Sequence, residues 1–336
     1  MEIMKIRKEQ IKLLTEFIIE KSLIFHPTIS PVGCPDFSNH YGKEYILIID
    51  RNIMTKIVEI CNTGTLKDQH ILKVISSLLF WAHFNHISIT GGLALNEYAN
   101  NKNNNTEASL ENDIFLTMFD QYPIKTWLDL FEGKVTTIPK INIPTRKEYT
   151  FDVKSNHQEM HLAATLHIWY LLVNQELSAT EKMIALLQWI DKNILFCQYS
   201  MVYAALLFSK QIKQPKLHEL SDIDNILKKS SNQAWDLTYL SFGSTLYWYE
   251  NEGNTIHLFA TMDTDLKKVF INTHNTKDDL FIRCFGEKGG IHINGHYQKI
   301  LADRQKPTIT DESINNLIKS ELNSLQSILS TYKVPN

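Results

Sequence analysis

The sequence predicts an α/β fold in which a central, mostly parallel sheet is interrupted by a large helical insertion. Residues 45–49 and 255–261 form two apolar runs that are rich in β-branched side chains and show little polar alternation. Such runs are typical of strands that helices cover on both faces of a parallel sheet. Segments with a helical period lie between the two runs, and strands separated by helices favour an α/β architecture.

The composition is that of a globular protein and excludes wholesale disorder. The chain has 336 residues, enough for one elaborated domain or two, and 43% of them are hydrophobic. The formal net charge is -3, so no general basic field indicates a nucleic-acid binder, although a local basic groove would be hidden in that total.

The cysteines and the N-terminus predict a cytoplasmic protein with no membrane partner. The cysteines lie far apart without a CxxC pair, which favours reduced thiols over a disulfide framework or a zinc knuckle. They are Cys34, Cys61, Cys197 and Cys284. The first ten residues carry charges where a signal peptide would need an apolar core. The longest apolar stretches, 75–84 and 166–173, are too short to span a bilayer.

Periodicity and breakers locate the elements of the first third of the chain. A helical stripe covers residues 7–25, and three prolines then predict a loop over 26–43. After the first strand, we expect helices over 52–60, 68–84 and 93–99, a short extended segment at 86–90 and a loop at 100–105.

The remainder of the chain is mostly helical, apart from the second strand and an extended connection at 134–153. Asn156 with Glu159, and Ser178 with Glu181, have capping-box spacing and predict helices that begin near 157 and 179. Further helices are expected over 199–212, 232–248, 264–270 and 311–332. A third strand is expected at 280–285, with turns at Gly289, Gly290 and Gly295.

These elements predict a split core with added helical parts, and no internal repeat is visible. The predicted parts are an N-terminal helix and loop (1–43), a first part of the core (44–110), a helical insertion (111–229), a second part of the core (230–305) and a C-terminal helix (306–336).

Each of the two predicted buried strands ends in an aspartate, Asp50 after the first and Asp263 after the second. Functional groups gather at the carboxyl ends of strands in open parallel sheets. Two neighbouring carboxylates repel each other unless a positive charge lies between them, and a divalent cation supplies that charge. Mg²⁺ needs few carboxylates because it keeps much of its water, and two such ions can promote phosphodiester cleavage. Glu97 and Asp236 are further acids that could contribute.

Four short motifs resemble those of PIN-domain nucleases, in the same order along the chain. The opening motif is Asp50-Arg51-Asn52, and residues 259–266, which contain Thr261 and Asp263, resemble the closing strand. Residues 92–98 resemble the family's helical segment with its acidic Glu97, and residues 234–236 resemble the helix start that carries the third acid, Asp236.

The resemblance implies a three-layer α/β/α sandwich and a metal-dependent endoribonuclease that uses Mg²⁺ or Mn²⁺ to hydrolyse RNA. The implied catalytic and metal-ligating residues are Asp50, Glu97, Asp236 and Asp263, with Asn52, Thr261 and Asp265 in supporting roles. The resemblance covers roughly residues 44–100 and 230–285, and the segment between Glu97 and Asp236 is longer than in compact members. Glu107 and Glu111 are alternatives to Glu97, and Asp222 and Asp224 are alternatives to Asp236. Asp265 is a substitute for, or a neighbour of, Asp263.

Other interpretations stay open beside the nuclease. Asp50 and Asp236 have a simpler role as helix caps, and Asn52 and Thr261 have one as hydrogen-bond partners of the backbone. A catalytically inactive PIN-like scaffold that binds a protein partner through the helical insertion is one alternative, and cleavage of DNA is another. A protein regulator or antitoxin, a toxin or defence role and a homo-oligomer are compatible with the sequence.

Other chemistries find little support in the sequence. His157 and His161 share a helix face, but the order His-Gln-Glu-Met-His misplaces the glutamate of a zinc metalloprotease. Capping with Asn156 explains Glu159 better. The sequence contains no GxGxxG motif, P-loop or Gly-x-Ser-x-Gly elbow, so no motif supports a nucleotide-cofactor site or a serine hydrolase.

Overall fold

The computed structural model describes residues 6–33, 35–37, 42–102, 104–142, 147–151, 156–216, 222–250, 253–275 and 278–331. Packing divides the chain into two units. Unit 1 comprises Met1–Val153 and Phe242–Asp263, and unit 2 comprises Lys154–Ser241 and Thr264–Asn336. The domain boundaries expected from the sequence stay a prediction.

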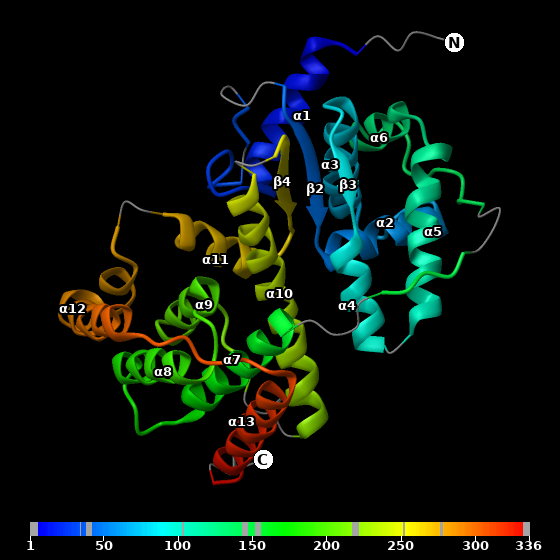
Figure 1. Cartoon of the computed structure of the whole chain (residues 1–336). Coiled ribbons are helices and arrows are strands. Elements are labelled where there is room, and N and C mark those ends of the chain that lie inside the picture. The colour runs from blue at the N-terminus through cyan, green and yellow to red at the C-terminus, as the bar shows by residue number, and fades with distance from the viewer. Residues whose placement is uncertain are drawn as a thin grey trace. The chain divides into compact units, whose positions relative to one another are not determined.

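The described part of unit 1 contains a four-stranded sheet with the strand order β1-β4-β2-β3, in which β4, β2 and β3 are labelled in Figure 1. The strands are β1 (Ile24–Phe25), β2 (Glu44–Ile49), β3 (Ser88–Thr90) and β4 (Thr255–Ala260). β2 is parallel to β3 and β4, whereas β1 is antiparallel to β4. The prediction of an α/β protein with a mostly parallel sheet is therefore confirmed, and both expected buried strands are present.

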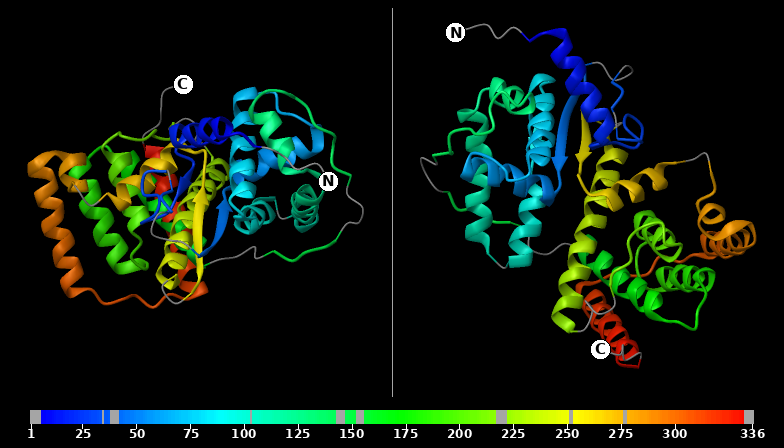
Figure 2. Two further views of the ribbon diagram at one scale, coloured as in Figure 1. Left: turned by 90° about the horizontal axis from the view of Figure 1, so that it is seen from above. Right: turned by 180° about the vertical axis from the view of Figure 1, so that it is seen from behind.

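β2 and β4 form the centre of this sheet and lie side by side in both views of Figure 2. Their register runs from Glu44 opposite Thr255 to Ile49 opposite Ala260. Apolar side chains fill the interior around both strands, and those of Ile49 and Ala260 are completely buried. Parallel pairing thus brings the carboxyl ends of two strands from distant parts of the sequence to the same edge of the sheet.

The helices of unit 1 follow the predicted order with changed ends. They are α1 (Lys8–Lys21), α2 (Arg51–Thr63), α3 (Gln69–Phe84), α4 (Gly92–Lys102), α5 (Asn105–Gln121) and α6 (Ile124–Phe131). The helix predicted over 7–25 ends early, because Ile24 and Phe25 pair with β4 as strand β1. The loop predicted at 100–105 is wrong over most of its length, since α4 extends to Lys102 and the Asn104 side chain caps α5 by accepting the Glu107 N–H at 3.0 Å.

Gly64 shows how closely the end of α2 meets the extended connection after α6. Its φ of +84° lies in the left-handed region, and a Cβ atom there would come within 2.4 Å of the Ile138 carbonyl oxygen. The Ile138 N–H donates to the Gly64 carbonyl at 2.8 Å. Glycine therefore satisfies both the backbone conformation and the close approach.

The described residues of unit 2 form helices joined by loops, and no strand lies among them. Its helices are α7 (Asn156–Val173), α8 (Ala179–Asn193), α9 (Gln198–Phe208), the first part of α10 (Ile223–Tyr249), α11 (Thr264–His274), α12 (Leu280–Asp303) and α13 (Asp311–Thr331). The capping box at Ser178 and Glu181 is confirmed, with reciprocal hydrogen bonds of 3.3 and 2.8 Å. Among the described residues of the chain, no helix is both long and apolar enough to cross a membrane.

The strand predicted at 280–285 is wrong, because these residues begin α12. Asp279 caps this helix by accepting the Ile282 N–H at 2.9 Å. The predicted turn glycines also lie within α12, where the helix kinks at Gly286 (φ +73°). A Cβ atom on Gly290 would come within 2.4 Å of the Ile282 Cα, so glycine there allows the backbone to fold closely after the kink.

The helix predicted over 232–248 begins earlier than expected. α10 starts at Ile223, after Asp222 accepts the Asn225 N–H at 2.8 Å, and it continues from unit 2 into unit 1. Asp236 therefore lies in the middle of α10, and its predicted position at a helix start is wrong.

The buried carboxylate of Glu321 joins three helices of unit 2. One oxygen lies 2.8 Å from His167 Nδ1 on α7, and the other accepts the Trp189 Nε1–H of α8 at 2.7 Å. The two rings stack with their centroids 4.5 Å apart. Because Glu321 is on α13, these contacts tie the C-terminal helix to the helices predicted as an insertion.

We expect Glu321→Ala to lower the free energy of unfolding by about 3 kcal/mol, because it leaves two partly buried partners, His167 and Trp189, without their acceptor. Urea unfolding of the full chain would measure this change. Glu312→Ala, on an exposed position of the same helix, should stay within about 0.5 kcal/mol of the wild type. Equal effects of the two substitutions would show that the Glu321 contacts contribute nothing specific.

Candidate functional site

The carboxyl ends of β2 and β4 bring Asp50 next to Thr261. Asp50 follows the last residue of β2, and its N–H donates to the Ala260 carbonyl at 3.1 Å. It is also the N-cap of α2, where Oδ1 accepts the Ile53 N–H at 2.8 Å. The interpretation of Asp50 as a helix cap is therefore confirmed, and capping fixes the direction of its carboxylate.

A chain of hydrogen bonds joins the two predicted strand-end aspartates. The Thr261 hydroxyl donates to Asp50 Oδ2 at 2.6 Å and accepts the Asp263 N–H at 3.0 Å. Asp50 and Thr261 are 2% and 1% exposed, so the hydroxyl replaces water around the carboxylate. The arrangement holds the Asp50 carboxylate and the Asp263 backbone at one edge of the sheet.

The pKa of Asp50 reflects this enclosed position. Burial, with a smaller contribution from the nearby Asp263 carboxylate, raises the pKa to about 6 against the opposing effect of the hydrogen bonds from Thr261 and Ile53. The Asn52 side chain in the first turn of α2 favours the ionised form. A buried carboxylate beside a second acid is an arrangement that stability alone does not favour.

Arg51, the residue after Asp50, is directed toward an acid on another helix. Its guanidinium forms a two-pronged ion pair with Glu111 of α5, with one N···O distance of 2.9 Å, and lies 4.1 Å from the centre of the Tyr98 ring. Arg51 is partly buried, and the ion pair with Glu111 fixes the direction of its guanidinium. Glu111, an alternative middle acid in the sequence, is held in this ion pair.

The other predicted acids are distributed over both units. Glu97 lies in unit 1 on α4, where its side chain is partly exposed. Asp236 belongs to unit 2, on α10. Asp265 also belongs to unit 2, in the first turn of α11, with its Oδ1 3.5 Å from Lys268 Nζ. The structure thus brings together Asp50, Thr261 and Asp263, while a joint role of all four acids stays a prediction.

Two carboxylates in this position fit a magnesium or manganese ion that the protein holds with few of its own ligands. Mg²⁺ is often held by one or two carboxylates together with water. A carboxylate oxygen can accept more than one contact, so the hydrogen bonds from Ile53 and Thr261 leave lone pairs of Asp50 for a cation. Within the described ranges, no group of three or more His, Cys, Asp or Glu side chains is arranged to hold a metal. Asp50 and Asp263 therefore fit a cation that two protein carboxylates hold together with water.

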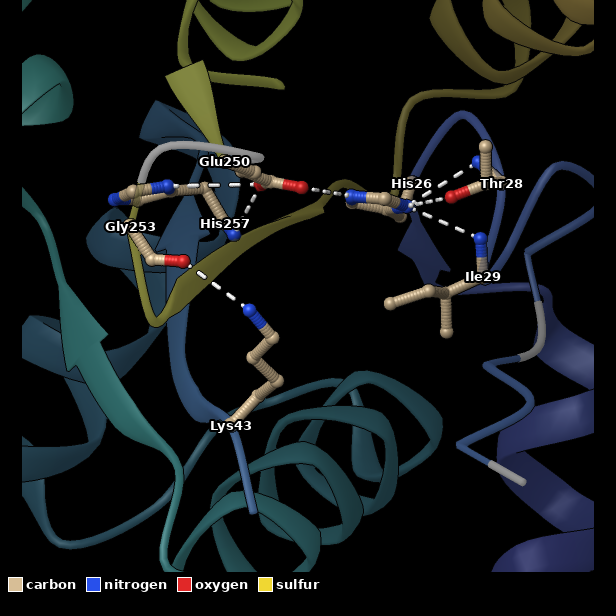
Figure 3. Close-up of polar contacts among 7 residues, drawn as sticks. All are labelled: His26, Thr28, Ile29, Lys43, Glu250, Gly253 and His257. Atoms are coloured by element: carbon tan, nitrogen blue, oxygen red, sulfur yellow. Dashed lines mark hydrogen bonds and ion pairs between the residues drawn. The ribbon is translucent and has the colours of Figure 1, made fainter. Parts of the chain in front are cut away.

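The opposite ends of β2 and β4 carry a buried polar network that sequence reasoning missed (Figure 3). His26 Nδ1 accepts the Thr28 and Ile29 N–H groups at 3.2 and 3.1 Å, so its Nε2–H donates to Glu250 at 2.9 Å. The other Glu250 oxygen accepts the His257 N–H of β4 at 2.7 Å. The network ties the loop after β1 to β4, and nothing in the local sequence pattern distinguishes its members.

The chain has no match among protein-family models, curated proteins or solved structures.

The raised pKa of Asp50 predicts a pH-dependent effect of Asp50→Asn. The native state binds the Asp50 proton more tightly than the unfolded chain, so the contribution of Asp50 to stability falls as pH rises from about 4 to about 6. The free energy of unfolding of Asp50→Asn, relative to that of the wild type, should therefore increase by up to about 3 kcal/mol over that pH range and stay constant at higher pH.

Urea unfolding with a chelator, at several values from about pH 4.5 to about pH 7.5, would measure the difference between the two proteins. Asp68→Asn is the matched control, because Asp68 also caps a helix of unit 1, α3, but is exposed to solvent. A difference for Asp50→Asn that does not change with pH would contradict the prediction.

Proposed function

We propose that this protein is a metal-dependent endoribonuclease of the PIN type. The observation that carries the proposal is the hydrogen-bonded series Asp50, Thr261 and Asp263, in which a buried carboxylate at the end of β2 meets the end of β4. These residues belong to the opening and closing motifs that resemble the family. The geometry supports the pairing of these two motifs across a parallel sheet.

The architecture of unit 1 is compatible with the proposed three-layer sandwich. β2 is flanked by two parallel strands, and helices α2 and α3 contribute to the same apolar core as β2 and β4. In an open sheet of this kind, the carboxyl edge is where ligands bind. The proposed active site therefore lies where the fold class would place one.

Asp50 and Asp263 are the proposed principal ligands of Mg²⁺ or Mn²⁺, and Glu97 and Asp236 are the proposed further acids. When bound, the ion supplies positive charge that stabilises the reacting phosphodiester. The α2 backbone and the Thr261 hydroxyl hold the Asp50 carboxylate in a fixed direction. Because both oxygens are oriented before a ligand arrives, little side-chain entropy is lost on binding.

The electrostatics of the site favour a cation as its occupant. Burial and the neighbouring Asp263 both disfavour the ionised form of Asp50, and among the described residues no Lys or Arg forms an ion pair with Asp50. A divalent cation would offset both effects and would be attracted most strongly above the pKa of Asp50. We therefore propose that the site binds metal at neutral pH and loses it under acid conditions.

We expect Asp50→Asn and Asp263→Asn each to reduce Mn²⁺-dependent cleavage of RNA by at least about 100-fold, because each replaces a negatively charged ligand of the ion with a neutral amide. Purified full-length protein would be assayed on a fluorophore-labelled single-stranded RNA, a structured RNA and a single-stranded DNA. Preferential cleavage of DNA would reassign the substrate and leave the metal site intact.

A second measurement separates metal binding from activity. Mn²⁺ at about 100 times its dissociation constant should stabilise the wild type by about 2.7 kcal/mol, and Asp50→Asn should lose that gain. Asp68→Asn should retain both activity and stabilisation, which controls for removal of a capping carboxylate. Wild-type cleavage by both aspartate variants would refute the nuclease, and a wild type without metal binding or cleavage would favour a PIN-like interaction module.

A further inference from the structure

Unit 2 contains a cysteine that faces a buried histidine and a serine from other segments of the chain. Cys197 directly precedes α9, and its Sγ lies 3.4 Å from Ser241 Oγ on α10 and 3.8 Å from His161 Nε2 on α7. Three separate segments therefore supply the cluster, and all of them belong to unit 2. The sequence did not suggest it, because the partners lie far apart along the chain.

His161 is held in place by a hydroxyl group at each ring nitrogen. Nδ1 lies 3.0 Å from Ser200 Oγ, and Nε2 lies 2.7 Å from Ser241 Oγ. The ring is 4% exposed, so its orientation is fixed by these contacts. The zinc pairing considered for His157 and His161 has no support among the described residues, because no suitable group of ligands is present there.

The geometry provides a path for the thiol proton. The Ser241 hydroxyl lies 2.9 Å from the Leu237 carbonyl and 2.7 Å from His161 Nε2, so it can donate to either. When it turns to His161, the Cys197 proton can pass to Ser241 Oγ while the Ser241 proton passes to Nε2, which leaves a thiolate and an imidazolium. The Nδ1–H of the imidazolium donates a hydrogen bond to Ser200 Oγ, which stabilises the charged ring. The N-terminus of α9 adds a positive dipole next to the sulfur, and helix N-termini favour thiolates.

The described cysteines differ in the direction of their pKa shifts. Burial raises the pKa of Cys61 to about 12, and burial also raises that of Cys284. Burial acts in the same direction on Cys197, but His161 and the hydrogen bonds from His161 and Ser241 outweigh it and lower the pKa to about 6. Cys197 is partly exposed as a residue, whereas Cys61 is buried, and the Cys197 sulfur itself is enclosed by its neighbours.

A merely structural cysteine would show a different combination of properties. Structural thiols are typically enclosed by apolar side chains, have raised pKa values and react slowly. Cys197 instead combines a lowered pKa, a histidine partner and a serine that contacts both. This combination resembles the requirement for an activated nucleophile, in which a base is itself oriented by a third group.

We propose that Cys197 is a nucleophilic thiolate, activated by His161 through Ser241, that peroxides oxidise reversibly to a sulfenic acid. The thiolate attacks one peroxide oxygen, the O–O bond breaks and an S–O bond forms. The leaving hydroxide takes the proton held on the imidazolium and departs as water. Sulfur is oxidised by two electrons and hydrogen peroxide is reduced by two, and a small thiol restores the cysteine.

The dependence of the alkylation rate on pH distinguishes an activated Cys197 from an ordinary thiol better than a rate at one pH. A thiolate of low pKa is more abundant but intrinsically less nucleophilic, so the two effects nearly cancel near pH 7. At about pH 5.5 the larger thiolate fraction dominates, and Cys197 should react about 20-fold faster than an ordinary accessible thiol. Full-length protein would be treated with iodoacetamide across a pH series, and each cysteine peptide would be quantified by mass spectrometry.

We expect the reaction of Cys197 to have its midpoint near pH 6, with Cys61 and Cys284 as internal controls that react only at higher pH. His161→Gln and Ser241→Ala should each move the Cys197 midpoint toward the ordinary thiol range of about 8.5. After brief exposure to hydrogen peroxide, dimedone should label Cys197 in the wild type. Dithiothreitol added after the peroxide but before the dimedone should prevent that labelling.

The wild-type profile decides the proposal even if a variant fails to fold. A midpoint in the ordinary thiol range, or peroxide labelling of Cys197 no faster than that of Cys284, would overturn it. A low midpoint that persists in both folded variants would exclude the role assigned to Ser241 and His161. These measurements do not involve RNA or added metal, so their outcome is independent of the proposed nuclease activity.

Discussion

The parallel pairing of β2 with β4 is the constraint on which the rest of unit 1 depends. The two strands are separated in sequence by most of the helices of both units, yet their register places Ile49 opposite Ala260. A shift of one residue would exchange the faces to which the side chains of the shifted strand point, so that both apolar layers would have to repack, and it would separate the Thr261 hydroxyl from Asp50. The burial of both strands therefore fixes the register of the core and the geometry of the candidate site together.

Strands and strand-end acids could be predicted because their signals are local. The apolar runs at β2 and β4 are continuous, and each is followed by an aspartate, so an α/β sheet with Asp50 and Asp263 at its carboxyl edge followed directly. Residues 280–285 carried a similar apolar signal but form a helix, because the Asp279 cap begins α12 there. Short apolar runs do not distinguish a buried strand from a buried helix.

Contacts between distant segments could not be predicted, since no periodicity encodes them. The Arg51 ion pair with Glu111, the Glu250 network and the contact of Cys197 with His161 each join segments from different elements. Asp236 shows a related difficulty, because the start of α10 depends on Asp222, which precedes the apolar pattern used to place the helix. The sequence therefore indicated which residue types carry chemistry better than which of them meet.

The order of the strands has a consequence for how this sheet behaves toward other chains. The longer strands, β2 and β4, lie inside the described sheet, whereas its borders are β1 with two residues and β3 with three. A short border strand offers few unpaired backbone groups on which a foreign strand could extend the sheet. The fold thus protects its long apolar strands from intermolecular β-pairing, and self-association of unit 1 would have to use side-chain surfaces instead.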